Sequence, residues 1–265
     1  MFSYPDNLPL GVKLFGDMRQ GGLFYGKVPL KSEVKFNGSL VPVSENGFFI
    51  LGFDRDLMQD NKLDIVLSNN KVETVKLNIM KRNWLIQKIE GLPSSMVSPD
   101  EVTAERIKKD NLQVKNIREK YSSKVFYNSS FIMPVDGQIT SVFGSQRILN
   151  GESRAPHSGI DIKARTGTPV KAAADGIVSL VNDDMYLTGK TVMVDHGMGL
   201  STIYVHLDQI DARLGQKVKQ GDVIGAVGAT GRATGPHLHF GVSVGTTRID
   251  PESFLNIGMP DFMKN

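Results

Sequence analysis

The sequence contains no cysteine, only one tryptophan and no long run of apolar residues. Without cysteine, no disulfide can hold the fold and no thiolate can bind a metal ion. Without an apolar stretch of about 20 residues, we expect no integral membrane segment. The formal net charge of +3 is too small to predict a nucleic-acid partner. The 265 residues, 40% hydrophobic and 22% charged, are typical of a globular protein of about two domains.

The first part of the chain has the pattern of short strands joined by tight turns. Asn-Gly pairs favour two-residue hairpins, because both positions of such a turn take positive φ. The residues from 72 to 79 alternate between apolar and polar types, which indicates a strand with one buried face. We therefore predict a small β-sandwich domain over residues 1–95. Its turns are expected at Asn37-Gly38, Asn46-Gly47 and Asn69-Asn70.

A helix is predicted next, within a linker and connector over residues 96–130. Ser98-Pro99-Asp100-Glu101 has the pattern of a capping box with proline at the first helical position. The run from there to about Tyr121 contains no glycine or proline, and its apolar positions are sparse. We expect a surface helix that packs on one side only.

From residue 131 to 265 the sequence predicts an antiparallel β domain, so the whole protein is expected to be mainly β. Glycine becomes frequent there, and short β-branched segments alternate with Gly, Asp and Pro turns. No helix of any length is expected after residue 130. The predicted strands cover residues 138–143, 176–181, 191–195, 201–205, 223–227 and 238–244.

All five histidines lie between positions 157 and 239, and three of them belong to two short patterns, His157-Ser158-Gly159-Ile160-Asp161 and His237-Leu238-His239. Two imidazoles and one carboxylate are a ligand set for a catalytic zinc ion that keeps its fourth position open for water. The HxH pair falls on a predicted strand, where alternate residues share a face. The HxxxD pattern is interpreted as a loop that enters a strand.

Each of these patterns has an ordinary structural interpretation when it stands alone. A lone HxH is more often a solvated or core pair than a metal site. The occurrence of both patterns in one glycine-rich β domain, together with His206, favours a metal site. His196 lies in Asp195-His196-Gly197, for which a structural hydrogen-bonding role is expected.

These motifs resemble those of the lysostaphin/LytM-type zinc metallopeptidases, which cleave peptidoglycan peptides, and the match runs from about Met133 to Phe254. The amino-terminal β region and helix are similar to those of the Gram-negative periplasmic members. The resemblance rests on the two histidine patterns and on further motifs: Phe143-Gly144, Gly167-Thr168-Pro169-Val170, Asp195-His196-Gly197, Tyr204-Val205-His206-Leu207, Val218-Lys219-Gln220-Gly221-Asp222 and the segment from Thr230 to Phe240.

The resemblance implies a catalytic domain over residues 131–265 with a lysostaphin-like fold related to the barrel-sandwich hybrid. It implies that one Zn²⁺ ion is held by His157, Asp161 and His239. His206 and His237 are then the catalytic residues, one of them accepting a proton and the other donating to the oxyanion; which is which stays open. The implied substrate is a peptidoglycan peptide, and the implied reaction is that of a DD-endopeptidase that cuts cross-links.

Alternative functions stay open at this point. The protein could be a carboxypeptidase that trims stem peptides, or a non-catalytic activator of wall hydrolases. The turn pattern around Gly221 also occurs in lipoyl-type carrier domains. A carrier function would leave the five histidines unexplained. The amino-terminal domain could position substrate, bind a partner or cover the cleft. We expect a monomer.

The expected location is the periplasm or cell envelope. The residues Met1-Phe2-Ser3-Tyr4-Pro5-Asp6 lack the basic start and apolar core of an export signal. The protein is therefore either cytoplasmic or exported by a signal that the given sequence does not include, and the motifs favour export.

Overall fold

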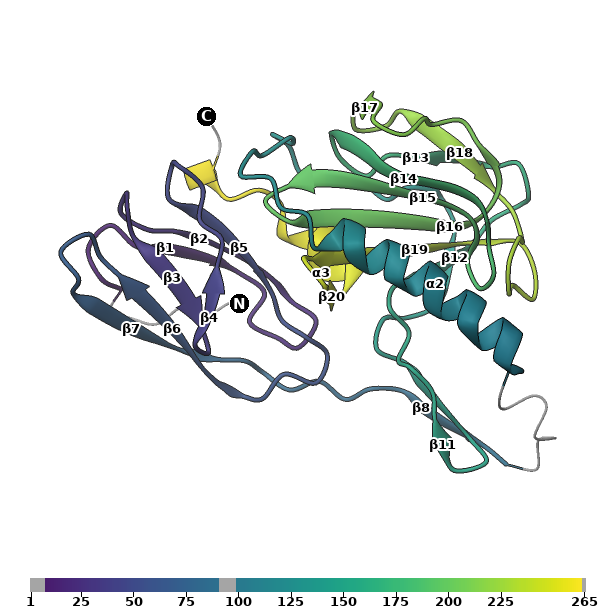
Figure 1. Cartoon of the computed structure of the whole chain (residues 1–265), viewed down its shortest axis with the longest axis horizontal. Helices are drawn as coiled ribbons and strands as arrows, with labels where there is room; N and C mark the ends of the chain where they lie inside the picture. Colours follow the sequence, from purple (N-terminus) through teal and green to yellow (C-terminus); the bar gives the residue numbers. More distant parts are fainter. Residues whose placement is uncertain (1–7, 91–98, 264–265) are drawn as a thin grey trace.

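The computed structural model describes residues 8–90 and 99–263, and most of its regular secondary structure is β-strand (Figure 1). The expected mainly β fold is confirmed. A smaller sandwich of two sheets lies beside a large sheet, and one long helix crosses the large sheet. Within the described residues, no helix is both long and apolar enough to span a bilayer. The predictions for the first six residues and for Ser98 lie outside the described residues.

The amino-terminal part forms the predicted β-sandwich. Its two sheets enclose a core of their own, which contains Phe24, Phe49, Leu63 and Val75. One sheet has the order β1-β2-β5, with bounds Lys13–Gly16, Leu23–Lys27 and Phe48–Gly52. The other has the order β4-β3-β6-β7, with bounds Ser39–Val41, Glu33–Phe36, Asp60–Val66 and Val72–Asn78.

Two of the three predicted hairpin turns are confirmed, and the third has a different role. Asn37 and Gly38 join β3 to β4 with φ of 50° and 83°, and Asn70, with φ of 63°, lies in the turn between β6 and β7. The Asn46-Gly47 turn does not close a hairpin, because it connects β4 and β5, which belong to different sheets. Strand β4 pairs with β3 and strand β5 pairs with β2, so this turn lies where the chain crosses from one sheet to the other.

The sandwich also contributes to the core of the large sheet. Leu23, Tyr25, Phe48 and Ile50, on the outer face of β2 and β5, pack in the same cluster as Tyr204 and Phe240. Both faces of the β1-β2-β5 sheet are therefore buried, which explains why β2 and β5 are apolar at successive positions. Because the two parts share this core, the division into 1–95, 96–130 and 131–265 stays a prediction.

The large sheet carries the main strands of the second half of the chain. Its order is β17-β14-β15-β16-β19-β12-β9, with β13, β18 and β20 attached off this path. The bounds are β9 Gln138–Ser141, β12 Ile160–Lys163, β13 Pro169–Lys171, β14 Gly176–Met185, β15 Gly189–Gly197, β16 Leu200–Ile210, β17 Lys217–Val218, β18 Val223–Val227, β19 His237–Val244 and β20 Thr247–Ile249. All six strands predicted after residue 130 are present, some with different ends.

A third, small sheet joins the segment that follows the sandwich to the second half of the chain. Strand β8 (Ile86–Ile89) pairs in parallel with β10 (Gln146–Leu149), and β10 pairs with β11 (Glu152–Ser153). Figure 1 shows this sheet projecting below the large sheet. It places the residues that follow the sandwich directly beside the loop that leads to His157.

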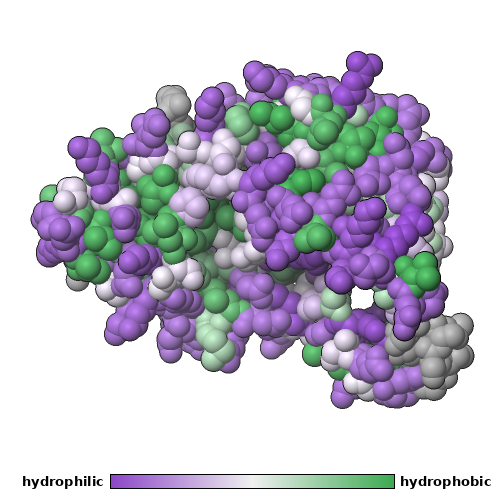
Figure 2. Space-filling view, viewed as in Figure 1, coloured by the Kyte–Doolittle hydropathy of each residue, from purple (hydrophilic) through white to green (hydrophobic). Residues whose placement is uncertain are grey.

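The helix α2 begins later than predicted. It covers Glu101–Arg118, and its cap is Asp100, whose side chain accepts a hydrogen bond from Thr103 N. Pro99 precedes the helix, so the prediction of Pro99 as the first helical residue was wrong. The predicted surface character is confirmed, because no residue of α2 is fully buried. Of its apolar residues, Val114 and Ile117 pack on the sheet, and the outer side of the helix is hydrophilic (Figure 2).

The expectation of no helix after residue 130 was wrong. The helix α3 covers Pro251–Ile257, and the 3-10 turn η1 covers Asp261–Met263. Asp250 caps α3 by accepting from Glu252 N, and Pro251 occupies its first turn. Asp-Pro-Glu is a helix-start signal in the sequence, but the helix that follows it is only seven residues long. Phe254 of α3 packs against the buried face of the large sheet.

Candidate metal centre

The HxH pair lies at the start of strand β19, where the alternation of the strand separates its side chains onto two faces. Leu238 and Phe240 are fully buried in the main core, whereas His237 and His239 are partly exposed on the opposite face. Both imidazoles therefore project from the same side of the sheet, as the spacing predicted.

The HxxxD pattern reaches the same place from the neighbouring strand. Asp161 lies in β12, directly opposite His239 in the antiparallel register. His157 precedes β12 in the loop that the sequence predicted. Gly159 allows this loop to pass close to β19, because a Cβ there would lie 2.2 Å from the carbonyl oxygen of Phe240. Strand pairing thus brings together residues that are 78 positions apart.

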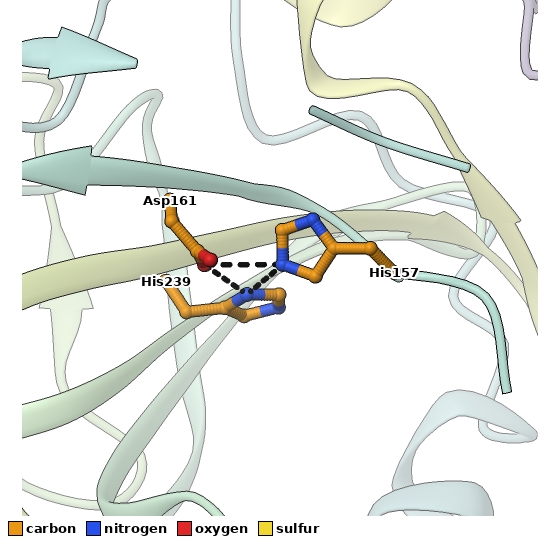
Figure 3. Close-up of side chains that lie close together, drawn as sticks. All are labelled: His157, Asp161 and His239. Carbon is orange, nitrogen blue, oxygen red and sulfur yellow. Dashed lines mark hydrogen bonds and ion pairs between the residues drawn. The ribbon is translucent and has the colours of Figure 1, made fainter. Parts of the chain in front are cut away.

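Three side-chain atoms converge at this point, one each from His157, Asp161 and His239 (Figure 3). His157 Nε2 lies 3.0 Å from Asp161 Oδ1 and 2.9 Å from His239 Nδ1, and His239 Nδ1 lies 2.8 Å from Asp161 Oδ1. Ligand atoms of a tetrahedral zinc ion lie about 3.3 Å apart, given bonds of about 2.0–2.1 Å. The triangle nearly matches one face of such a tetrahedron, so the donor set fits zinc in both chemistry and spacing.

The protein environment determines which ring nitrogen of His157 faces this triangle. His157 Nδ1 lies 3.1 Å from the carbonyl oxygen of Val142 and 3.2 Å from Ser141 Oγ. A carbonyl oxygen can only accept, so Nδ1 carries the proton and Nε2 presents its lone pair to the triangle. Sequence reasoning missed these supporting contacts, because a backbone acceptor has no side-chain signature.

The electrostatics of the triangle favour a carboxylate anion. Burial by itself would raise the pKa of Asp161, but hydrogen bonds and charge interactions with His157 and His239 outweigh it, and the pKa is lowered. Burial is the main cause that lowers the pKa of His239. The lowered pKa values of Asp161 and His239 favour an anionic carboxylate and a neutral imidazole, the forms in which these side chains bind metal ions.

His206 and His237 lie beside the triangle. The His237 and His206 rings are 4.7 Å apart between centroids, and His237 Nε2 lies 3.9 Å from Asp161 Oδ1. His206 Nδ1 lies 2.8 Å from Thr230 O, and His237 Nδ1 lies 2.8 Å from Gly235 O. Each ring therefore donates through Nδ1 to a backbone carbonyl, and each keeps the lone pair of Nε2 available when neutral.

The backbone of strand β16 is distorted at His206. Regular alternation would place this side chain on the same face as Tyr204, in the main core. His206 instead has a φ of 62°, in the left-handed region, and the register with β15 shifts at this point. The distortion returns Leu207 to the core and brings the His206 ring beside His237. A non-glycine residue in this conformation costs about 1–3 kcal/mol, a strain that clusters at functional sites.

The remaining histidine lies elsewhere and is enclosed. His196 is fully buried in β15, and its two ring nitrogens contact Asp175 O at 2.8 Å and Thr202 Oγ1 at 2.9 Å. Burial lowers its pKa to about 4. The expected hydrogen-bonding role of His196 is confirmed.

Comparisons with known proteins agree with this geometry. The profile of Peptidase family M23 matches residues 155–251, which include all five histidines. A crystal structure from Pseudomonas aeruginosa assigned to peptidase M23 is 30% identical, with a TM-score of 0.68 over 90% of this chain and 95% of that one. This likeness extends through the amino-terminal sandwich as well as the large sheet.

Two curated relatives match the histidine-bearing part. Peptidoglycan DD-endopeptidase ShyA of Vibrio cholerae is 43% identical over 110 residues, which are 40% of this chain and 25% of that protein. The DD-carboxypeptidase/endopeptidase Mpg of Neisseria meningitidis is 42% identical over 97 residues, 37% of this chain and 22% of that protein. The matches thus span about a quarter of these relatives' lengths. The chain belongs to peptidase family M23, a family of zinc metallopeptidases that act on the cell wall.

Proposed function

We propose that this protein is a zinc-dependent peptidoglycan hydrolase that cuts peptide cross-links, a DD-endopeptidase of the periplasm or cell envelope. His157, Asp161 and His239 would hold one zinc ion, and His206 and His237 would be the catalytic residues. The observation that carries the proposal is the convergence of three donor atoms within 3.0 Å of one another, flanked by two imidazoles with available Nε2 atoms.

The chemistry divides between the ion and the side chains. When bound, zinc lowers the pKa of water to about 7 and polarises the scissile carbonyl. The hydrolysis then needs a group that takes a proton from the attacking water and a group that supplies one to the leaving amine. The sequence contains no HExxH glutamate for this purpose. A neutral imidazole with its Nδ1–H fixed can accept at Nε2 and later return the proton.

His206 and His237 meet this requirement in the same way. The carbonyl groups of Thr230 and Gly235 fix their tautomers, so each presents Nε2 as an acceptor. One would accept the proton of the attacking water, and the other, when protonated, would donate to the developing oxyanion. As the C–N bond breaks, the protonated imidazole gives its proton to the departing amine.

The experiment that tests the proposal is digestion of purified sacculi followed by mass analysis of the products. An endopeptidase releases monomeric muropeptides from cross-linked dimers. A His239→Ala variant, prepared in parallel, should release none. If the zinc-loaded protein leaves cross-links intact, the proposed function is wrong.

A carboxypeptidase is the second candidate, because the relative from Neisseria meningitidis is named for both activities. The same digestion distinguishes the two, since a carboxypeptidase shortens stem peptides by one alanine and leaves cross-linked dimers in place.

A further inference from the structure

The backbone of His157 is held by the segment just before the β10–β11 hairpin. His157 N donates to Ser145 O at 2.8 Å, and Gly144 N donates to His157 O at 2.9 Å. The ring of His157 is held by Ser141 and Val142, from the same segment. The position of this imidazole therefore depends on the position of residues 141–145.

That segment is in turn held by the sandwich and the chain that leaves it. Arg55, which follows β5, donates from Nε to Gly144 O at 2.8 Å and from an Nη atom to Gln146 Oε1 at 3.2 Å. Gln146 N donates to Leu85 O at 2.8 Å, beside the parallel pairing of β8 with β10. Residues more than 50 positions away thus support the loop that carries His157.

The single tryptophan completes this support. The Trp84 ring lies against Gly144, where a Cβ would come within 2.3 Å of it, and Gly144 itself has a φ of 77°. The ring centroid of Trp84 lies 5.9 Å from that of Phe143, which is buried. The space occupied by the indole explains why a glycine stands at this position.

Two arginines contact the indole of Trp84 but form hydrogen bonds to different residues. Arg55 lies 5.2 Å and Arg82 lies 4.6 Å from the ring. Arg82 bonds to Asp250, at the cap of α3, at 2.6 Å. Arg55 alone of the two bonds to the segment that holds His157. The Arg55 side chain is only 11% exposed, so loss of its bond to Gly144 O would leave a shielded carbonyl without this donor.

We propose that Arg55 is a positioning residue for the metal centre, and that the sandwich serves as a brace for the loop that carries His157. The inference rests on the proposed function, in which His157 binds zinc. Arg55 acts through Gly144 and touches neither metal nor substrate. Groups that hydrogen-bond a metal ligand directly orient it, and their loss typically weakens metal affinity 10–100-fold. Arg55 lies one contact further out, so we expect the lower end of this range.

The test compares the zinc dissociation constants of the full-length wild-type protein, Arg55→Met and Arg82→Met, measured by competition with a chelator. Methionine keeps an unbranched apolar chain over the indole but removes the guanidinium in both variants. We expect Arg55→Met to weaken zinc binding about tenfold. Arg82→Met should change the dissociation constant less than twofold, although it removes the partly buried ion pair with Asp250 at the same interface.

A lysine variant and two zinc-binding controls distinguish the possible results. Arg55→Lys, which retains one donor, should restore part of the affinity and serves as the measurement if Arg55→Met does not fold. If zinc binding is weakened equally in the two methionine variants, or not at all in Arg55→Met, the proposed role of Arg55 is wrong. Failure of the proposed function gives a different result: the wild-type protein would bind no zinc, or His239→Ala would bind it as well as wild type.

Discussion

Two histidine environments on the same large sheet differ in what the second ring nitrogen contacts. Both nitrogens of His196 contact protein oxygens inside the core. His206 and His237 each have Nδ1 bonded to a backbone carbonyl, and both rings lie beside the triangle of donor atoms. A histidine satisfied on both sides stabilises the fold, whereas a histidine satisfied on one side is positioned and still free to react. The imidazole is the same in both, so its surroundings decide its role.

The comparison predicts its largest effect at the triangle itself. His239→Ala removes one of three ligands, so we expect loss of bound zinc and of all detectable digestion of sacculi. Metal analysis of the purified variant, alongside a digestion assay, measures both. Circular dichroism serves as the control, because β19 should keep its pairing. A variant that retained stoichiometric zinc would contradict the assignment.

A smaller effect is expected beside the triangle. His206→Ala and His237→Ala should each keep zinc and lose about 10²–10⁴-fold in turnover, the usual contribution of a positioned acid or base. Rates at saturating zinc, with metal content checked for each variant, provide the measurement. If His237→Ala lost zinc while His239→Ala kept it, the roles within the HxH pair would be reversed.

His196 should make the stability of the fold depend on pH, and it should contribute little to catalysis. Its pKa falls from 6.5 to about 4 on folding, because burial disfavours the charged ring. The unfolded chain therefore binds more protons between these values, so folding stability falls as pH decreases from 6.5 to 4. The loss attributable to this residue approaches roughly 3 kcal/mol.

Urea unfolding of the wild-type protein and His196→Gln, at several pH values between 4 and 7, isolates this contribution. The difference between their unfolding free energies should shrink as pH falls, since glutamine does not titrate. A difference that stays constant across this range would mean that His196 is not held neutral by the fold.

The smallest effect is expected at the cap of α2. Asp100→Ala removes the bond to Thr103 N, which typically costs about 1 kcal/mol in a helix. Because α2 buries little of its surface and lies outside the triangle, activity should stay within twofold. Thermal unfolding measures the loss of stability, and the digestion assay measures the activity. A large loss of activity would show that α2 supports the site.

The sequence predicted the site better than the surroundings that hold it. Spacing alone indicated that His237 and His239 share a face, because the period of a strand is two. The left-handed conformation at His206 and the support of His157 by Arg55 had no local signature, since they depend on strands paired across the fold. Helix α3 did have a signal, Asp250-Pro251-Glu252, but seven residues are too few for a helical period to stand out.

The measurement that tests the central claim most directly is anomalous X-ray scattering at the zinc edge from crystals of the zinc-loaded protein. We predict a single peak within about 2.0–2.2 Å of His157 Nε2, Asp161 Oδ1 and His239 Nδ1, with the rings of His206 and His237 near it but not bonded. A peak bonded to His237 in place of His239, or no peak at this triangle, would contradict the account.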